Sequence, residues 1–419
     1  LAGQAAREKI AESSNKFNLS LDPETRKLFE SAEKIEELVK TRKIIQGNEQ
    51  NKRHIVVLGV TGSGKSTLVN SLAGCKIVRM SAEEADRLPD GNRDAVRVEP
   101  PPPAVTDIGA GMESVTSVFH PIDIRSEEAM AWDAPGFGDT RSVEINIANA
   151  VNLAEVLKLS SSHGGLGGLV IVVVVDKPSL QASRGESLRK TFDNLKQLFA
   201  SDLRGLEDSL KSMVFCVTKN NGTYALHKLK DMLAKAFYEE LFKDKETDRG
   251  ANEEWTNNGL RPRVEDFDPL DPRKNTESIG GNELLRELMR LEPLRPTSFR
   301  PPLENKDRMH LMKLTKLAKD LVVKCMWNGR FREVEMLFNV CDSLQVIKHQ
   351  DVEHCFDDLV EVMNRVVVSW EQEVRNALKD FSEDGRVQIS VVFEVMRQAK
   401  DLDEMLLSRG KPLGIMEKH

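Results

Sequence analysis

The chain has 419 residues, enough for two or three domains, and its 40% hydrophobic and 30% charged residues are typical of a folded globular protein. Its net charge of −7 weighs against nucleic acid as a partner, because phosphates repel an acidic surface. The longest apolar run, residues 169–175, is too short to cross a bilayer, and five scattered cysteines without a CxxC pair argue against a disulfide or zinc framework.

Residues 1–50 are expected to form a helical N-terminal extension. No signal peptide is recognisable, and membrane association is not indicated, so we expect a cytoplasmic protein. Asp22 can cap a helix that has Pro23 at its first position. Apolar side chains then recur at helical spacing at Leu28, Ala32, Ile35 and Val39. We expect this face to pack against the domain that follows.

Residues 51–295 alternate between strand-like and helix-like segments. Buried parallel strands are expected at residues 54–58, 169–175 and 213–217, with helices at residues 145–159 and 188–198. The last strand and the closing helix are expected at residues 264–270 and 280–291. This alternation predicts an α/β fold with a doubly wound, mostly parallel sheet.

An insert at about residues 80–111 interrupts this domain. It is charged and contains Pro100–Pro103, a stiff polyproline segment. We expect a surface loop, with a docking site for a protein partner as the alternative.

A complete phosphate-binding loop, GxxxxGK[ST], lies between the first expected strand and a helix. Its glycines let backbone N–H groups curl around phosphates, and the helix N-terminus adds a favourable dipole. Lys65 is expected to reach the β- and γ-phosphates, and the Ser66 hydroxyl to ligate Mg²⁺. The expected phosphate-binding residues are Gly59, Thr61, Gly62, Ser63, Gly64, Lys65, Ser66 and Thr67.

Four further motifs follow in order, at residues 114–117 (SVTS), 133–137 (DAPGF), 167–175 (GGLVIVVVV) and 217–221 (VTKNN). Together they resemble the septin-like branch of P-loop GTPases, most closely the immunity-associated (GIMAP/avirulence-induced) family, with septins and the chloroplast-import Toc GTPases as cousins. The resemblance covers about residues 53–225. It implies GTP or GDP with Mg²⁺ as cofactors, slow hydrolysis stimulated by self-association, and a homodimer or oligomer formed through the GTPase domain.

The resemblance also assigns residues around the γ-phosphate. It implies that Asp133 holds Mg²⁺ through water, that the Gly136 N–H senses the γ-phosphate, and that Thr116 ligates Mg²⁺ as the threonine of switch I. Thr106 is the rival for that last role. The alternatives without a functional role are an ordinary turn at the Asp-Ala-Pro-Gly segment and a threonine within a strand at position 116.

The base-binding motif departs from the family, because Asn221 stands where the usual [NT]-K-x-D motif has Asp. An Asn offers one acceptor and one donor, so one guanine donor faces a donor, at a cost of about 1–3 kcal/mol. Xanthine fits Asn better, and a water or a nearby acid can rescue guanine. We expect base binding by Thr218, Lys219 and Asn221, and a plain strand-to-loop exit is the alternative.

Hydrolysis needs a group that the motif does not supply, because Phe137 follows Gly136 where many small GTPases have a water-orienting Gln. Thr61, Ser63, the insert or a dimer partner would have to contribute. By their position in the sequence, three residues are candidates for this catalytic group, although each is more simply a surface or loop residue: Arg141, Arg184 and His163.

Residues 296–304 are expected to be a proline-rich linker and residues 305–419 a helical bundle domain. Apolar residues mark one face of a first helix at Leu311, Leu314, Leu317 and Leu321. Near-heptad spacing follows at Val352, Phe356, Leu359, Met363, Val366, Trp370 and Ala377, which leaves a coiled-coil dimer as an alternative. A protein partner is expected to bind these helices or the insert.

Three functions fit the sequence. The first is a Mg²⁺-dependent guanine-nucleotide-binding switch or assembly GTPase of low intrinsic activity. The second is an ATPase in which Asp176 ends a Walker B strand, although no Leu-Ser-Gly-Gly signature and no following Glu are present. The third is a non-enzymatic scaffold that keeps a nucleotide and acts through its helices.

Overall fold

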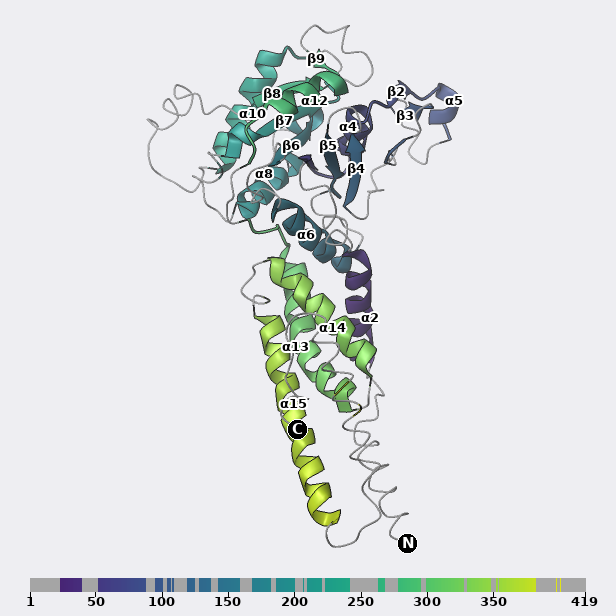
Figure 1. Cartoon of the computed structure of the whole chain (residues 1–419). Coiled ribbons are helices and arrows are strands. Elements are labelled where there is room, and N and C mark those ends of the chain that lie inside the picture. The colour runs from purple at the N-terminus through teal and green to yellow at the C-terminus, as the bar shows by residue number, and fades with distance from the viewer. Residues whose placement is uncertain are drawn as a thin grey trace, which may run out of the picture. The chain divides into compact units, whose positions relative to one another are not determined.

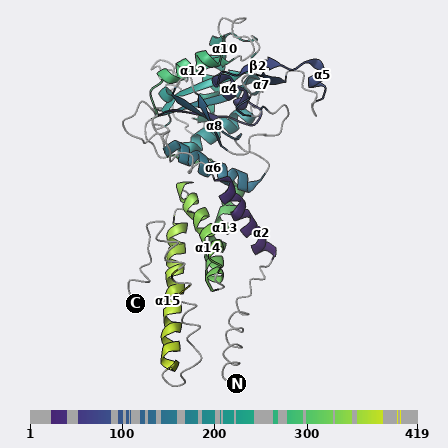
Figure 2. The same ribbon diagram turned by 45° about the vertical axis from the view of Figure 1, so that its right-hand side comes forward.

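The computed structural model of the chain separates into two compact units (Figures 1 and 2). The residues that it describes are 23–39, 52–87, 95–100, 104–106, 108, 119–124, 128–136, 142–158, 168–181, 186–199, 206, 209–220, 223–241, 263–267, 278–294, 299–327, 330–347, 352, 354–381, 397 and 400. None of the helices among these residues is long and apolar enough to span a membrane.

The first unit is the α/β unit. In chain order it contains β1 (Arg53–Leu58), α4 (Lys65–Leu72), β2 (Lys76–Arg79), α5 (Ala82–Ala85), β3 (Val96–Glu99), β4 (His120–Ile124), β5 (Ala129–Asp133), α6 (Val143–Leu157), β6 (Gly168–Asp176), α7 (Lys177–Gln181), α8 (Glu186–Leu198), η3 (Leu210–Ser212), β7 (Met213–Thr218), α10 (Leu226–Leu241), β8 (Arg263–Phe267), β9 (Ser278–Ile279) and α12 (Gly281–Arg290). The expected strands and helices of this region are present with ends shifted by a few residues, but the strand expected to be the last, at residues 264–270, is followed by one more, β9.

Seven strands of this unit form one sheet in the order β4-β5-β1-β6-β7-β8-β9. β4 runs antiparallel to β5, and every other neighbouring pair is parallel. The mostly parallel sheet predicted from the sequence is therefore confirmed. Because β1 lies between β5 and β6, the strand order reverses at β1, and ligands of such sheets bind beyond the carboxyl ends of the strands at this point.

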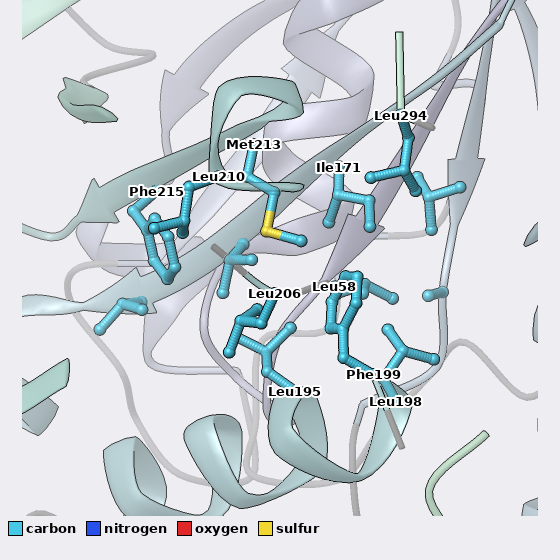
Figure 3. Close-up of a cluster of buried hydrophobic side chains, with 14 of the residues drawn as sticks. Leu58, Ile171, Leu195, Leu198, Phe199, Leu206, Leu210, Met213, Phe215 and Leu294 are labelled. Carbon is cyan, nitrogen blue, oxygen red and sulfur yellow. The ribbon is translucent and has the colours of Figure 1, made fainter. Parts of the chain in front are cut away.

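Both faces of the sheet are covered by helices, which explains why its central strands are continuous apolar runs rather than alternating ones. On one face, side chains of α6, α8 and α10 pack on Leu58, Ile171 and Phe215. Figure 3 shows Leu195 and Leu198 of α8 in this cluster. On the other face, side chains of α4 and α12 pack on Ile55 and Val172. Successive strand residues thus point to opposite faces, and helices on both sides make the sheet doubly wound, as predicted.

The region expected as a surface loop is partly a hairpin. β2 and β3 form a separate antiparallel two-stranded sheet, with α5 between them, which stands away from the main sheet in both views (Figures 1 and 2). A capping box between Ser81 and Glu84 begins α5, and Arg97 pairs with Glu84 at 3.3 Å. Residues 101–103 of the proline segment lie outside the described residues.

The second unit is helical. It contains α2 (Pro23–Leu38), α13 (Asn305–Trp327), α14 (Phe331–Leu344), η4 (Gln345–Ile347) and α15 (Cys355–Phe381). The helical C-terminal region predicted from the sequence is therefore present.

The N-terminal helix belongs to this helical unit, which corrects the expectation that it packs as part of the domain that follows it in the chain. Within it, the Ser31 hydroxyl and the His310 ring lie 2.7 Å apart, and the Asn339 amide donates to the Glu36 carboxylate at 2.5 Å. These contacts join α2 to α13 and α14, which are neighbours of α15 in the bundle (Figure 1).

The described part of the expected linker, residues 299–304, packs onto the α/β unit. The Phe299 ring meets Phe199 edge-on at 5.5 Å, and the Arg300 N–H donates to the Leu198 carbonyl at 2.8 Å. This segment is therefore anchored to the end of α8 instead of spanning free space.

Candidate functional site

The phosphate-binding loop leaves the carboxyl end of β1 and leads into α4, which begins at Lys65. Gly59, Gly62 and Gly64 have φ angles of 152°, 77° and 99°, a region that favours glycine. A Cβ atom at Gly59 would also lie 2.5 Å from the Val174 carbonyl oxygen, so the loop can cross β6 only without a side chain there. The turn is a consequence of these glycines.

Two side chains of the loop can donate hydrogen bonds to a phosphate. The Lys65 ammonium donates to the Val60 carbonyl at 2.9 Å, so its charge lies over the loop backbone. The Ser63 hydroxyl is buried without a hydrogen-bond partner in the structure. A buried donor of this kind fits a phosphate oxygen, which accepts hydrogen bonds.

The Asp-Ala-Pro-Gly segment lies directly beside this loop. Asp133 ends β5 opposite Val57 of β1, and its side chain is 0% exposed. A Cβ atom at Gly136 would lie 2.5 Å from the Thr61 nitrogen, so the two backbones touch at this point. The fold therefore brings Lys65, Ser66, Asp133 and Gly136 to one edge of the sheet, as the sequence predicts.

A short segment of the insert also reaches this edge. The Thr106 hydroxyl donates to a carboxylate oxygen of Asp133 at 2.8 Å. The Asn70 side chain on α4 donates to the Thr106 carbonyl at 2.8 Å and accepts from the Val105 N–H at 2.8 Å. Thr116 lies outside the described residues, so its predicted role in metal binding is untested.

The segment expected to bind the base braces the phosphate loop from β7. The Thr218 hydroxyl donates to the Ser63 carbonyl at 2.7 Å, and the Lys219 ammonium donates to the Gly62 carbonyl at 2.8 Å. Lys219 has a φ of 58°, a left-handed conformation that is uncommon for a residue with a side chain. Because its ammonium bonds Gly62, the aliphatic stem of Lys219 runs along the phosphate loop. Asn221 lies outside the described residues.

The third residue of this motif faces the protein interior. The buried Asn220 amide donates to the Asp266 carboxylate and to the Tyr224 carbonyl, each at 2.8 Å, and its oxygen accepts from the Tyr224 N–H at 3.0 Å. Asn220 thus ties the end of β7 to Tyr224 and to β8.

Asp176, the Walker B candidate, ends β6 beside the same edge. One carboxylate oxygen accepts from the backbone N–H of Ser179 at 3.2 Å and from its hydroxyl, which caps the start of α7. The other oxygen pairs with Lys219 at 3.4 Å. These contacts give Asp176 a structural role in the loop that follows β6.

Sequence reasoning missed Asn70 and Asp266 as members of the site. A polar Asn within an apolar helical stretch was a usable signal for Asn70, because Asn is a weak helix former and needs a partner when buried. The candidates Phe137, Arg141, His163 and Arg184 lie outside the described residues.

The donor set of the edge fits magnesium better than zinc. No group of three or more His, Cys, Asp or Glu side chains that could hold a metal occurs in the part of the chain that the structure describes. Magnesium is typically held by one or two protein oxygens together with substrate phosphates, a pattern that the Ser66 hydroxyl and the buried Asp133 carboxylate match.

Comparison with known proteins gives distant structural likenesses. No protein-family model matches the chain, and no curated protein matches it. Among solved structures, it is similar to the signal recognition particle receptor SRb-GTP/SRX complex from Chaetomium thermophilum, with 14% identity over 57% of this chain and 99% of that chain, at a TM-score of 0.34. It is also similar to a dimerization-deficient mutant of Toc33 from Arabidopsis thaliana, with 14% identity over 61% of this chain and 89% of that chain, at a TM-score of 0.32.

Proposed function

We propose that this chain binds guanine nucleotide with Mg²⁺ and acts as a switch or assembly protein with slow GTP hydrolysis. The observation that carries the proposal is the meeting of three segments at one edge of the sheet. These are the phosphate loop, the Asp-Ala-Pro-Gly segment with Asp133 and Gly136, and the Thr218–Lys219 pair. A loop of this sequence and placement binds nucleotide phosphates through its backbone N–H groups and the α4 N-terminus.

Each residue of the edge has a role in this proposal. Lys65 exchanges the Val60 carbonyl for the β- and γ-phosphates, and Ser63 supplies its unpartnered hydroxyl to a phosphate oxygen. Ser66 and Asp133 hold Mg²⁺, which when bound would neutralise phosphate charge. Gly136 N–H and Thr116 respond to the γ-phosphate, as the resemblance implies.

Guanine is the base that the proposal favours. The Lys219 stem lies along the loop, where it offers an apolar surface to a base plane. Asn221 supplies one acceptor to the base edge in place of the usual two. Because Phe137 cannot polarise water, hydrolysis is slow and depends on a second group brought by self-association, either through this unit or with a partner on the helices.

The ATPase alternative is less well supported. It assigns metal binding to Asp176, whose carboxylate already caps α7 and pairs with Lys219. A scaffold that keeps its nucleotide without turnover remains the second candidate, and Phe137 is the feature that favours it.

The test is direct measurement of nucleotide binding by the full chain. Nucleotide released by heat is identified by chromatography, and GTP, XTP and ATP are then titrated with Mg²⁺. We expect GTP or GDP, and we expect Asn221→Asp to raise the preference for GTP over XTP. Tighter binding of ATP than of GTP would overturn guanine specificity. GTP binding without hydrolysis would favour the non-enzymatic scaffold over the GTPase.

The loop assignment is tested by Lys65→Ala. Loss of a charged hydrogen-bond donor costs about 1.5–3 kcal/mol, so affinity should fall at least about 10- to 150-fold with an unchanged circular dichroism spectrum. Lys230→Ala, an exposed lysine on α10, is the matched control and should bind as the parent chain does. Normal binding by Lys65→Ala would show that the loop is not the phosphate site.

A further inference from the structure

Asn70 connects three parts of the candidate site. It lies on α4 four residues after Ser66, and its side chain is 0% exposed. Its amide nitrogen donates to the Ser66 carbonyl at 2.9 Å and to the Thr106 carbonyl at 2.8 Å, and its oxygen accepts from the Val105 N–H at 2.8 Å. One buried side chain therefore holds the turn of Ser66 and the segment Val105–Thr106 together.

The segment so held reaches the carboxylate that the proposed function assigns to magnesium. The Thr106 hydroxyl donates to Asp133 at 2.8 Å, and Val105 packs against the apolar cluster between the sheet and α4. A carboxylate that binds a metal is usually oriented by a further hydrogen bond, and loss of such a partner typically costs 10- to 100-fold in metal affinity.

We propose that Asn70 and Thr106 are positioning residues for magnesium. Asn70 fixes the backbone of Val105 and Thr106 on α4, and the Thr106 hydroxyl then orients the Asp133 carboxylate. Neither residue touches the nucleotide in this assignment. The segment acts on Asp133 whether or not a γ-phosphate is present, which separates its role from that expected of Thr116.

This inference rests on the proposed function and has its own test. The full chain is titrated with the fluorescent nucleotide mant-GDP, first in EDTA and then at increasing Mg²⁺ concentration. For Thr106→Val, which keeps the shape without the hydroxyl, we expect the Mg²⁺ concentration for half-maximal effect to rise about 10- to 100-fold. Affinity in EDTA should not change, because the hydroxyl acts only through Asp133.

Two matched variants test the specificity of this effect. Thr106→Ser retains a hydroxyl and should restore the parental Mg²⁺ requirement. Thr315→Val, the same change on α13 of the helical unit, should leave the requirement with mant-GDP unchanged, because its hydroxyl donates to carbonyls of its own helix. A parental Mg²⁺ requirement for Thr106→Val would overturn the inference alone, whereas a parent chain that binds no mant-GDP would overturn the proposed function and the inference together.

Asn70 is tested without nucleotide by hydrogen exchange. In Asn70→Ala the Val105 amide loses its acceptor, so its exchange should accelerate about five- to tenfold, while amides of β7 keep their protection. The double variant Asn70→Ala, Thr106→Val should need no more Mg²⁺ than Thr106→Val alone, because both changes break one chain of contacts. Additive effects would show that Asn70 acts elsewhere.

Discussion

At the scale of single residues, the site depends on close backbone approaches that few side chains permit. Gly59 crosses β6, and Gly136 lies against the backbone of Thr61. The sequence predicted that both glycines belong to the site, because the motifs that contain them are continuous along the chain. It could not predict the Asn70–Thr106 contact, which joins residues 36 positions apart.

We predict that Gly136→Ala weakens GTP binding by about tenfold or more, since a methyl group 2.5 Å from the Thr61 nitrogen forces the loop and the Asp-Ala-Pro-Gly segment apart. The measurement is GTP affinity by calorimetry. Adding Thr61→Ala removes the side-chain oxygen but should not restore binding, because the Thr61 backbone nitrogen still lies 2.5 Å from the added methyl group. Restoration would place the clash on the Thr61 side chain instead.

Asn220 carries a second prediction at this scale. Asn220→Ala removes three hydrogen bonds, of which the one to Asp266 is buried, and leaves the Asp266 carboxylate with one donor fewer, so we expect a loss of about 2–4 kcal/mol in urea unfolding. The affinity for GTP should also fall, because Asn221 is the next residue in the chain. Asp266→Asn, which can still accept from Asn220, should be milder, and an equal loss would contradict this account.

At the scale of elements, apolar runs predicted the strands that are buried on both faces. β6, at residues 168–176, and β7, at residues 213–218, contain the continuous apolar runs at residues 169–175 and 213–217. The hairpin of β2 and β3 escaped prediction because its strands are four residues long and half charged. Such strands are held by pairing and by ion pairs such as Arg97–Glu84, which composition does not reveal.

The helical unit offers a matched pair of substitutions on α15. Trp370 is 2% exposed and meets Trp327 of α13 edge-on at 6.0 Å, whereas Val368 is 63% exposed. We expect Trp370→Ala to cost about 3–5 kcal/mol of unfolding free energy and Val368→Ala less than about 0.5 kcal/mol. Denaturant titration followed by circular dichroism measures both, and similar losses would show that α15 is not packed through Trp370.

At the scale of the whole molecule, the two units contain separate sets of buried thiols. Cys75 and Cys216 belong to the α/β unit, and Cys325, Cys341 and Cys355 to the helical unit. Burial raises the pKa of Cys216 and raises that of Cys325 to about 11. The pKa of Cys341 is raised by its hydrogen bond with Cys355 and by burial. At pH 8 a thiol of pKa about 11 is only about 0.1% thiolate, the reactive form.

Because all five thiols are buried, we predict that none of them reacts with a disulfide reagent at pH 8 until the chain unfolds. In increasing urea, labelling should reach the two sets at different midpoints, because each unit has its own core. GTP at 100 times its dissociation constant should stabilise only the set of Cys75 and Cys216, by about 2.7 kcal/mol. Mass spectrometry of labelled peptides measures this, and equal protection of both sets would mean that the units unfold as one.

The two outer strands of the seven-stranded sheet are poorly suited to pair with a strand of a second copy of this chain. β4 contains Pro121, which has no N–H to offer a neighbour, and its Asp123 carboxylate is held by Lys52 at 2.9 Å. β9, at the opposite border, is two residues long. Proline, charge and shortness are the devices that discourage strand-to-strand joining of one sheet to the next. A filament or dimer of this protein would consequently have to be built from side-chain surfaces, not by extending its sheet across the boundary between molecules.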